Sequence, residues 1–198
     1  MQTERVIAET RAWLDRAVIG LNLCPFAKAV QAKGQVRYIV SDAADVETLQ
    51  AHLAQAMQEL VATDPEVTDT VLLIHPQVLQ DFEEFNEFLG IAEDTLAALD
   101  LEGVLQVAHF HPQFQFADAA PGDISHATNQ SPYPTLHLLR EDSIDRAVEA
   151  FPEPEAIYEA NITTMEGLGA AGWAALQAQW QADAEAALAA AKGAPPST

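Results

Sequence analysis

The spacing of apolar residues predicts a chain built mainly from amphipathic helices. Residues 4–19 place apolar side chains on one face at the helical period, with polar residues between them. The side chains expected to face inward are Val6, Thr10, Trp13, Ala17 and Val18. Residues 46–62 and 82–99 show the same period, and Asp45 and Asp81 stand where a carboxylate can cap the first turn. The inward face of the first of these two helices is expected to hold Val46, Leu49, Leu53, Met57 and Leu60.

Four shorter segments have the pattern of strands. Val36, Tyr38 and Val40 alternate at the strand period, whereas residues 70–74 form a continuous apolar run typical of a strand buried on both faces. Further strands are predicted over residues 104–110 and 136–139. Residues 112–134 follow neither period and are rich in proline, so regular structure is not expected there.

The C-terminal third reads as helical. Ser143 is expected to cap a helix that runs to Phe151, and Pro154 suits the first turn of another that ends near Gly167–Gly169. An alanine-rich helix over residues 171–191 should follow.

The order of these elements predicts an α/β fold. Helices separate the first three strands, which favours parallel pairing in part, and the long connection before the fourth strand favours an antiparallel partner. We therefore expect one layered α/β domain over residues 1–192, with a mixed four-stranded sheet flanked by helices. Residues 193–198 are expected to be a disordered tail.

The charge of the chain disfavours some classes of binding partner. There are 30 acidic against 9 basic residues, and residues 38–139 contain no Lys or Arg. Such a surface repels phosphate backbones and anionic lipids, so neither nucleic acid nor a membrane is an expected partner. The simplest role of the excess acid is solubility.

Other classes of protein are disfavoured by what the chain lacks. A single cysteine, Cys24, rules out an internal disulfide framework. No apolar run approaches the ~20 residues of a membrane span, and the N-terminus does not resemble a secretory signal. No glycine-rich phosphate loop or dinucleotide motif appears, so NAD and ATP are not expected cofactors. A cytoplasmic protein of bacterial type is the simplest interpretation.

Four blocks of sequence together resemble a known family. They are GLNLCPFAKA at 20–29, VLLIHPQVLQDFEEFNEFL at 71–89, FHPQFQFAD at 110–118 and SPYPTLHLLRE at 131–141. The chain is similar in these blocks to the bacterial family named domain of unknown function 1415, a resemblance that implies no particular activity. Two positions depart from the family pattern, His109 in place of serine and Gln130 in place of arginine. A mechanism that needs His109 would therefore not be shared by the family.

Polar chemistry is concentrated in residues 109–141, which hold four of the six histidines. His109 and His111 alternate on a predicted strand, so their imidazoles should lie on one face about 6–7 Å apart. That arrangement suits a divalent metal, with Asp118 as a third ligand and His137 or Cys24 as a further one. The alternative is that both histidines are ordinary partners of buried hydrogen bonds.

Two other arrangements suggest catalysis. His75 and His111 each follow a strand and precede a proline, and they would meet at one edge of the sheet if these two strands run parallel. Cys24 precedes Pro25, which either ends the first helix or opens a short second one. If Pro25 opens a helix, the N-terminus of that helix would lower the pKa of the Cys24 thiol. A histidine such as His137 could then activate the sulfur as a nucleophile. The alternatives are strand-ending His–Pro pairs and a cysteine packed as a small apolar side chain.

A binding role is possible for the residues that surround these groups. Arg140 is the first cation after Arg37 and could hold an anion, or instead pair with a neighbouring acid. The proline-stiffened loop could present Asn129, Ser131 and Tyr133 to a ligand, or simply be ordered without one.

The sequence thus favours a small enzyme, a hydrolase or lyase with or without a divalent metal, acting on a small polar or anionic molecule. His111, His75, His137 and Cys24 are its candidate catalytic groups. The alternative is a non-catalytic module that binds a ligand or a protein. The substrate, any cofactor other than a possible divalent metal, and the oligomeric state are left open.

Overall fold

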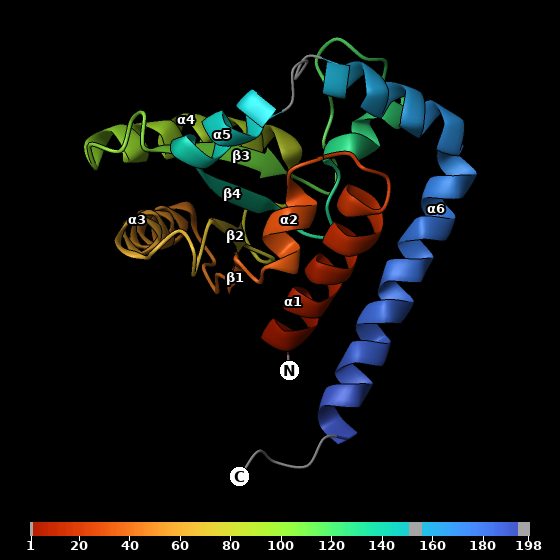
Figure 1. Ribbon diagram of the computed structural model, residues 1–198, viewed down its shortest axis with the longest axis horizontal. Helices are drawn as coiled ribbons and strands as arrows, with labels where there is room; N and C mark the ends of the chain where they lie inside the picture. The colour runs from red at the N-terminus through yellow and green to blue at the C-terminus, as the bar shows by residue number, and fades with distance from the viewer. Residues whose placement is uncertain (1, 151–155, 194–198) are drawn as a thin grey trace.

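The computed structural model describes residues 2–150 and 156–193 and consists of a four-stranded sheet with helices on both faces (Figure 1). The strands are β1 (Val36–Val40), β2 (Thr70–Ile74), β3 (Leu105–Phe110) and β4 (Thr135–Arg140). The helices are α1 (Gln2–Trp13), α2 (Ala27–Ala32), α3 (Val46–Ala62), α4 (Phe82–Ala98), α5 (Glu141–Ala150) and α6 (Ala156–Gly193). A π-helix, η1 (Leu14–Ile19), continues α1, and a 3-10 helix, η2 (Ile124–Asn129), lies between β3 and β4.

The sheet is mixed, with the strand order β1-β2-β4-β3. β1 and β2 are parallel because α3 carries the chain back between them, whereas β4 is antiparallel to both of its neighbours. The predicted α/β class, the mixed four-stranded sheet and the antiparallel fourth strand are confirmed. β4 enters between β2 and β3, so β3 becomes an edge strand.

Consecutive strand residues face opposite layers of the molecule. Leu73 and Leu136 pack with side chains of α3 and α4 in one core, and Leu72 and Ile74 pack with Val6 of α1 on the other face. On this second face α6 lies along α1 (Figure 1), and Trp173 and Trp180 join the N-terminal helix in a core of their own. The five N-terminal side chains predicted to face inward are all buried.

α3 and α4 begin directly after the two aspartates that were predicted to cap them. The Asp45 side chain accepts a hydrogen bond from the Thr48 N–H at 2.7 Å, and Asp81 accepts from the N–H groups of Glu83 and Glu84. The prediction for Val46 was wrong, because this first residue of α3 leaves 37% of its surface exposed.

Three further expectations needed correction. The η2 turn forms inside residues 112–134, because Asp123 caps it by accepting from the Ser125 N–H at 2.8 Å. Ser143 does not cap a helix, since α5 begins at Glu141 directly after β4, and the Ser143 hydroxyl donates instead to Asp69 at 2.6 Å. Pro25 does not open a helix, because α2 begins only at Ala27.

α6 is two helices joined at a kink. Gly169 has φ 66° and ψ 172°, a conformation outside the helical region, at the place where the sequence predicted a helix end. Three predictions fall outside the described residues: the helix end at Phe151, the helix start at Pro154 and the disordered tail over residues 194–198. Gly193, which was predicted to begin that tail, is the last residue of α6.

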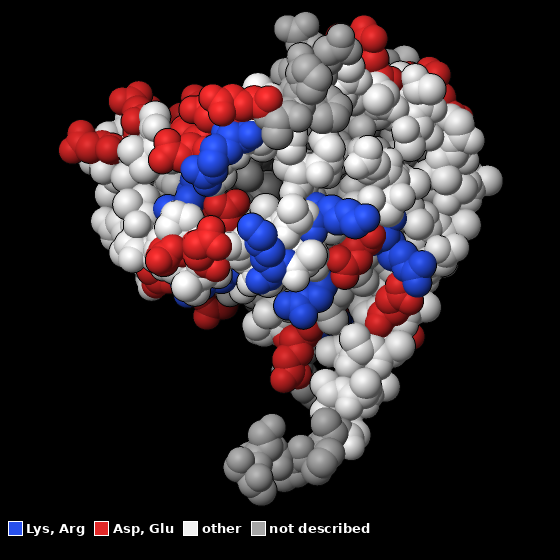
Figure 2. Space-filling model, in the orientation of Figure 1, with Lys and Arg blue, Asp and Glu red and all other residues white. Residues whose placement is uncertain are grey.

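Charge is distributed unevenly over the surface. Figure 2 shows Lys and Arg side chains lying mainly over α1 and α2 on one face, with Asp and Glu near the end where α4 and α5 lie. This agrees with the sequence, in which six of the nine basic residues stand at or before Arg37. None of the described helices is long and apolar enough to cross a membrane.

The kink at Gly169 gives a direct test of the fold. Gly169→Ala should lower the free energy of unfolding by about 1–3 kcal/mol, because that φ/ψ region is almost exclusive to glycine. The cost is backbone strain alone, since a Cβ at Gly169 would meet no atom within 4 Å. Gly167→Ala is the matched control, equally free of contacts but at a helical position. It should stabilise the protein by about 0.5–1 kcal/mol in urea unfolding; equal effects of the two substitutions would contradict the kink.

Candidate functional site

Three predicted site histidines gather on the α4 face of the sheet. β2 and β3 run in the same direction, so His75 and His111 lie at one edge, as the His–Pro spacing suggested. Both rings pack against Phe85 of α4, with ring centroids 5.6 Å away for His75 and 5.0 Å for His111. His109 packs on the same ring at 6.0 Å and on Phe114 at 5.7 Å. The cluster is therefore an aromatic one as much as a polar one.

The nitrogens of these histidines are largely committed to the backbone. His111 accepts from the Gln113 N–H at Nδ1 (3.0 Å) and donates from Nε2 to the Leu79 carbonyl (3.2 Å). Its lone pair and its proton are both used, which suits a structural role. His75 donates from Nδ1 to the Val78 carbonyl at 3.0 Å, and its Nε2 is buried with no partner among the described residues.

Burial keeps these imidazoles neutral. His75 and His111 have no exposed surface, and loss of hydration disfavours their charged forms. The pKa of His75 falls to about 4, chiefly through burial and with a smaller contribution from His111. Burial also lowers the pKa values of His109 and His111.

No metal-binding cluster is found. Across residues 2–150 and 156–193, no group of three or more His, Cys, Asp or Glu side chains is arranged to hold a metal ion. Asp118, the predicted third ligand to His109 and His111, has an exposed side chain in the loop after β3.

His137 lies on the opposite face of the sheet. Its neighbours are Phe110, with ring centroids 6.0 Å apart, and Thr70. The Thr70 hydroxyl donates to the Leu138 carbonyl at 2.6 Å, so His137 Nε2 is the donor in its own 2.6 Å bond to Thr70. Burial lowers the pKa of His137 to about 4. The structure therefore does not bring His137 together with His75 and His111.

Arg140 closes the end of α3. Its Nη2 donates to the carbonyls of Leu60 (2.6 Å), Thr63 (2.7 Å) and Thr68 (3.2 Å), which ties the end of α3 to the loop that leads into β2. It forms neither the anion clamp nor the acid pair that the sequence suggested among the described residues.

Cys24 and Asn129 line a cavity of about 400 Å³ beside β3, which we call the β3-edge cavity. Residues 106–110 of β3 form one wall, and Asn161 of α6 lies on another. His109 contributes to this wall, but its ring packs on Phe85 and Phe114, so it makes no hydrogen bond to the Cys24 sulfur. The Cys24–histidine pairing expected from the sequence does not form among the described residues.

Ser131 and Tyr133 line a second cavity of about 240 Å³ between α1, the 130–133 segment and α6, which we call the α1–α6 cavity. Its lining residues are Glu9, Pro112, Gln130, Ser131, Pro132, Tyr133, Trp173, Gln177, Trp180 and Gln181. The Ser131 hydroxyl donates to the Tyr133 carbonyl at 2.6 Å, which stiffens the segment.

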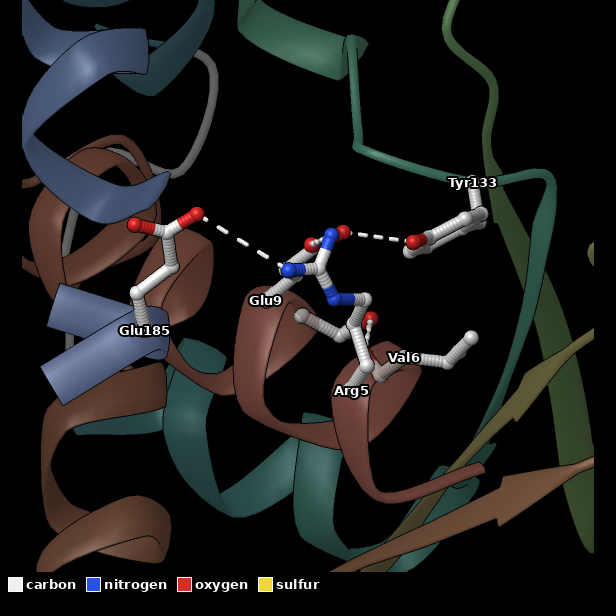
Figure 3. A network of polar contacts seen from close by, with 6 residues as sticks. Arg5, Val6, Glu9, Tyr133 and Glu185 are labelled. Atoms are coloured by element: carbon white, nitrogen blue, oxygen red, sulfur yellow. Dashed lines mark hydrogen bonds and ion pairs between the residues drawn. The ribbon is translucent and has the colours of Figure 1, made fainter. Parts of the chain in front are cut away.

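A polar network stands at this cavity. The Tyr133 hydroxyl points at Glu9 and donates to its carboxylate at 2.5 Å, and Arg5 lies between Glu9 and Glu185 (Figure 3). The nitrogens of Arg5 are 3.7 Å from Glu9 and 3.8 Å from Glu185. Burial and the Glu9 carboxylate raise the pKa of Tyr133 above its ordinary value. Trp173 is 6% exposed, and no acceptor among the described residues meets its Nε1–H.

Sequence reasoning did not identify Glu9 or the α6 residues of this cavity. Glu9 stands on the polar side of the α1 pattern, and Trp173 and Trp180 are both buried side chains of the core. Gln177 and Gln181 are four residues apart, which places them on one face of α6. That spacing was the available signal, but nothing local to α6 shows that it faces Tyr133.

The family resemblance is confirmed by comparison with family models. The model described as Protein of unknown function (DUF1415) matches residues 5–175. The chain belongs to this DUF1415 family. No curated protein and no solved structure matches the chain.

The match to the DUF1415 model covers the two cavities unequally. Every residue named at the β3-edge cavity lies within residues 5–175. At the α1–α6 cavity, Gln177, Trp180 and Gln181 lie beyond the matched residues, as does Glu185. On the α6 side of that cavity, the family pattern therefore covers Trp173 but not Gln177, Trp180 or Gln181.

The free energy of unfolding should decrease at acidic pH because of the buried histidines. Because the folded-state pKa of His75 is about 4 and the unfolded value is 6.5, the unfolded chain takes up the proton first as pH falls. Stability should be constant with respect to this group above pH ~6.5 and should fall by about 3 kcal/mol between pH ~6.5 and ~4. His75→Gln should flatten this part of the curve in urea unfolding at several pH values.

His137→Gln should likewise reduce the pH dependence of the free energy of unfolding between pH ~6.5 and ~4. Its effect should be independent of that of His75→Gln, because His137 lies on the other face of the sheet. A wild-type slope that neither substitution changes would show that these histidines titrate normally.

The role of Arg140 is testable by substitution. Arg140→Met should lower the free energy of unfolding by about 2–4 kcal/mol, because three carbonyls lose a charged donor. Arg140→Lys should fall between Met and wild type. Arg146→Met is the control, since the Arg146 side chain is exposed and hydrogen-bonds to Ser143 at 2.9 Å, and its loss should cost less than about 0.5 kcal/mol. Equal effects of the two Met substitutions would argue against the helix-end role.

Proposed function

We propose that this protein binds a small, positively charged polar molecule in the α1–α6 cavity. The observation that carries the proposal is the lining of that cavity, in which Glu9 is the one charged side chain among the described residues and Tyr133, Trp173 and Trp180 also take part. The proposal takes up the ligand-binding alternative, because the histidines intended for catalysis have their nitrogens engaged or buried.

The charge of the lining selects the class of ligand. A carboxylate without a lining Lys or Arg repels anions and attracts an ammonium group. Trp173, Trp180 and Tyr133 present aromatic rings, whose faces attract cations. This replaces the anionic ligand expected from the sequence, since Arg140 is engaged at the end of α3.

Arg5 does not line the cavity, but it is a cation that already contacts the Glu9 carboxylate. Its side chain is 54% exposed and its contact with Glu9 is long, at 3.7 Å. An exposed pair of this kind is worth about 0–1 kcal/mol, so a ligand ammonium can displace Arg5 at little cost. The Tyr133 hydroxyl would meanwhile hold the carboxylate in place.

The size and polarity of the cavity narrow the choice further. A volume of about 240 Å³ lies below the ~300–1,000 Å³ of drug-sized sites, which favours a small metabolite. The amides of Gln177 and Gln181 and the indole N–H of Trp173 provide hydrogen bonds for its neutral polar groups. Hydrolase or lyase activity stays a prediction. If the cavity is catalytic, Glu9 is the carboxylate among its described lining residues that could act as the general acid or base.

Three probes of matched size test the charge preference, namely ethanolammonium, ethylene glycol and glycolate. Titration into isotope-labelled protein should move the indole N–H resonances of Trp173 and Trp180 with ethanolammonium and not with glycolate. The indole N–H of Trp13 donates to the carbonyl of Gln130, a lining residue, at 2.9 Å, so its resonance reports on the opposite wall of the same cavity.

Two substitutions should act in opposite directions. Glu9→Gln keeps an acceptor for Tyr133 but removes the charge, and should weaken ethanolammonium binding about ten- to hundredfold. Arg5→Gln removes the competing cation and should strengthen it. Ethylene glycol should respond to neither change. Glycolate binding as strongly as ethanolammonium, or no response to any probe, would refute the proposal.

A further inference from the structure

In the part of the chain that the structure describes, no strand covers the outer edge of β3 along the β3-edge cavity. β3 ends the strand order and pairs with β4 on one side, and no described strand pairs with its other side. Residues 106–110 of β3 instead face a cavity of about 400 Å³.

Two hydrogen bonds establish which backbone groups point into that cavity. The Glu141 N–H donates to the Val104 carbonyl, so Val104 and every second residue after it face β4. The His111 N–H donates to the Asn129 carbonyl at 3.2 Å, so the alternate residues face away from β4. Val107 and His109 belong to this second set and line the cavity. Their N–H and C=O groups are the donors and acceptors that a further strand would use.

This edge lacks the features that normally protect an edge strand. The sequence LQVAHF contains no proline and no charged residue, and its register with β4 runs without a bulge from Leu105 to Phe110. Natural sheets commonly block exposed edges with charges, prolines or bulges, because an unpaired edge recruits other strands. An unprotected edge beside a cavity is therefore suited to pairing.

The opposite wall suits an extended backbone. Asn129 and Asn161 carry side-chain amides, which match the donor and acceptor of a peptide unit, and Asn161 is held by donating to the Leu23 carbonyl at 2.9 Å. Val18 and Leu23 add apolar surface for side chains. The Asn129 carbonyl already bonds to His111, so an entering strand would continue a pairing that begins there.

We propose that the β3-edge cavity binds an extended peptide segment of another protein, which adds a strand antiparallel or parallel to β3 through Val107 and His109. This mode is the addition of a strand to an open sheet edge. None of the described residues that line the cavity is charged, so the paired residues of the segment are uncharged. The formal net charge of −21 favours Lys and Arg in the flanks of the segment and disfavours a second copy of this chain.

Hydrogen exchange of single amides tests the geometry and the partner together. In the free protein, the amides of Val107 and His109 should exchange faster than those of Gln106 and Ala108, which face β4. The probe is a pool of capped peptides with a randomised run of uncharged residues flanked by lysines. At millimolar concentration it should slow exchange at Val107 and His109 by about tenfold or more and leave Gln106 and Ala108 unchanged.

A pool with backbone N-methylation at alternate positions is the matched control, because it keeps charge and side chains but cannot form the ladder. It should give no protection; equal protection by both pools would show attraction by charge and overturn the proposal. Val107→Pro should abolish binding while keeping the β4 ladder, and the N-methylated pool provides the same test if that variant does not fold.

Two other outcomes would overturn the proposal. No protection by the unmodified pool at either outward amide would show that the edge does not pair with peptides. Protection that grows with protein concentration without any peptide would show that a second copy occupies the edge.

Discussion

Consecutive residues of a strand point to opposite faces of a sheet, and in this protein helices cover both faces. Within one strand, alternate residues therefore meet α3 and α4 or meet α1 and α6, and the register between strands decides which residues share a face. This rule sends His75, His109 and His111 to Phe85 of α4 and sends His137 to Thr70 and Phe110. The separation of four histidines that look like one site follows from the pleat of the backbone.

The same sheet explains where polar surface remains available. Its interior histidines and Arg140 satisfy backbone groups at the ends of strands and helices, which is the usual destination of buried polar side chains. The polar groups that remain available to a ligand or partner lie in two cavities at the margins of the sheet instead. One margin is the α1–α6 cavity, built from side chains around Glu9, and the other is the β3-edge cavity, built largely from backbone.

α6 links these two regions. Its first part brings Asn161 to the β3-edge cavity, and after the kink at Gly169 its second part packs along α1 and brings Trp173 and Trp180 to the other cavity (Figure 1). A straight helix could not follow both paths. The positive φ at Gly169 is therefore a condition for both proposed binding regions, although it touches neither.

Local patterns were enough to predict most of the helices and strands, the carboxylate caps of α3 and α4 and the break near Gly169. Each of these depends on residues within a few turns of one another, through side-chain period, capping geometry or glycine conformation. The partners of individual polar groups depended on contacts between distant segments. Glu9 meets Tyr133 across 124 positions, and Arg140 reaches Leu60 across 80, because folding brings separate elements together at distances that no local spacing encodes. The order β1-β2-β4-β3, which leaves the edge of β3 open, is likewise a result of packing, since β4 pairs where it buries both of its faces.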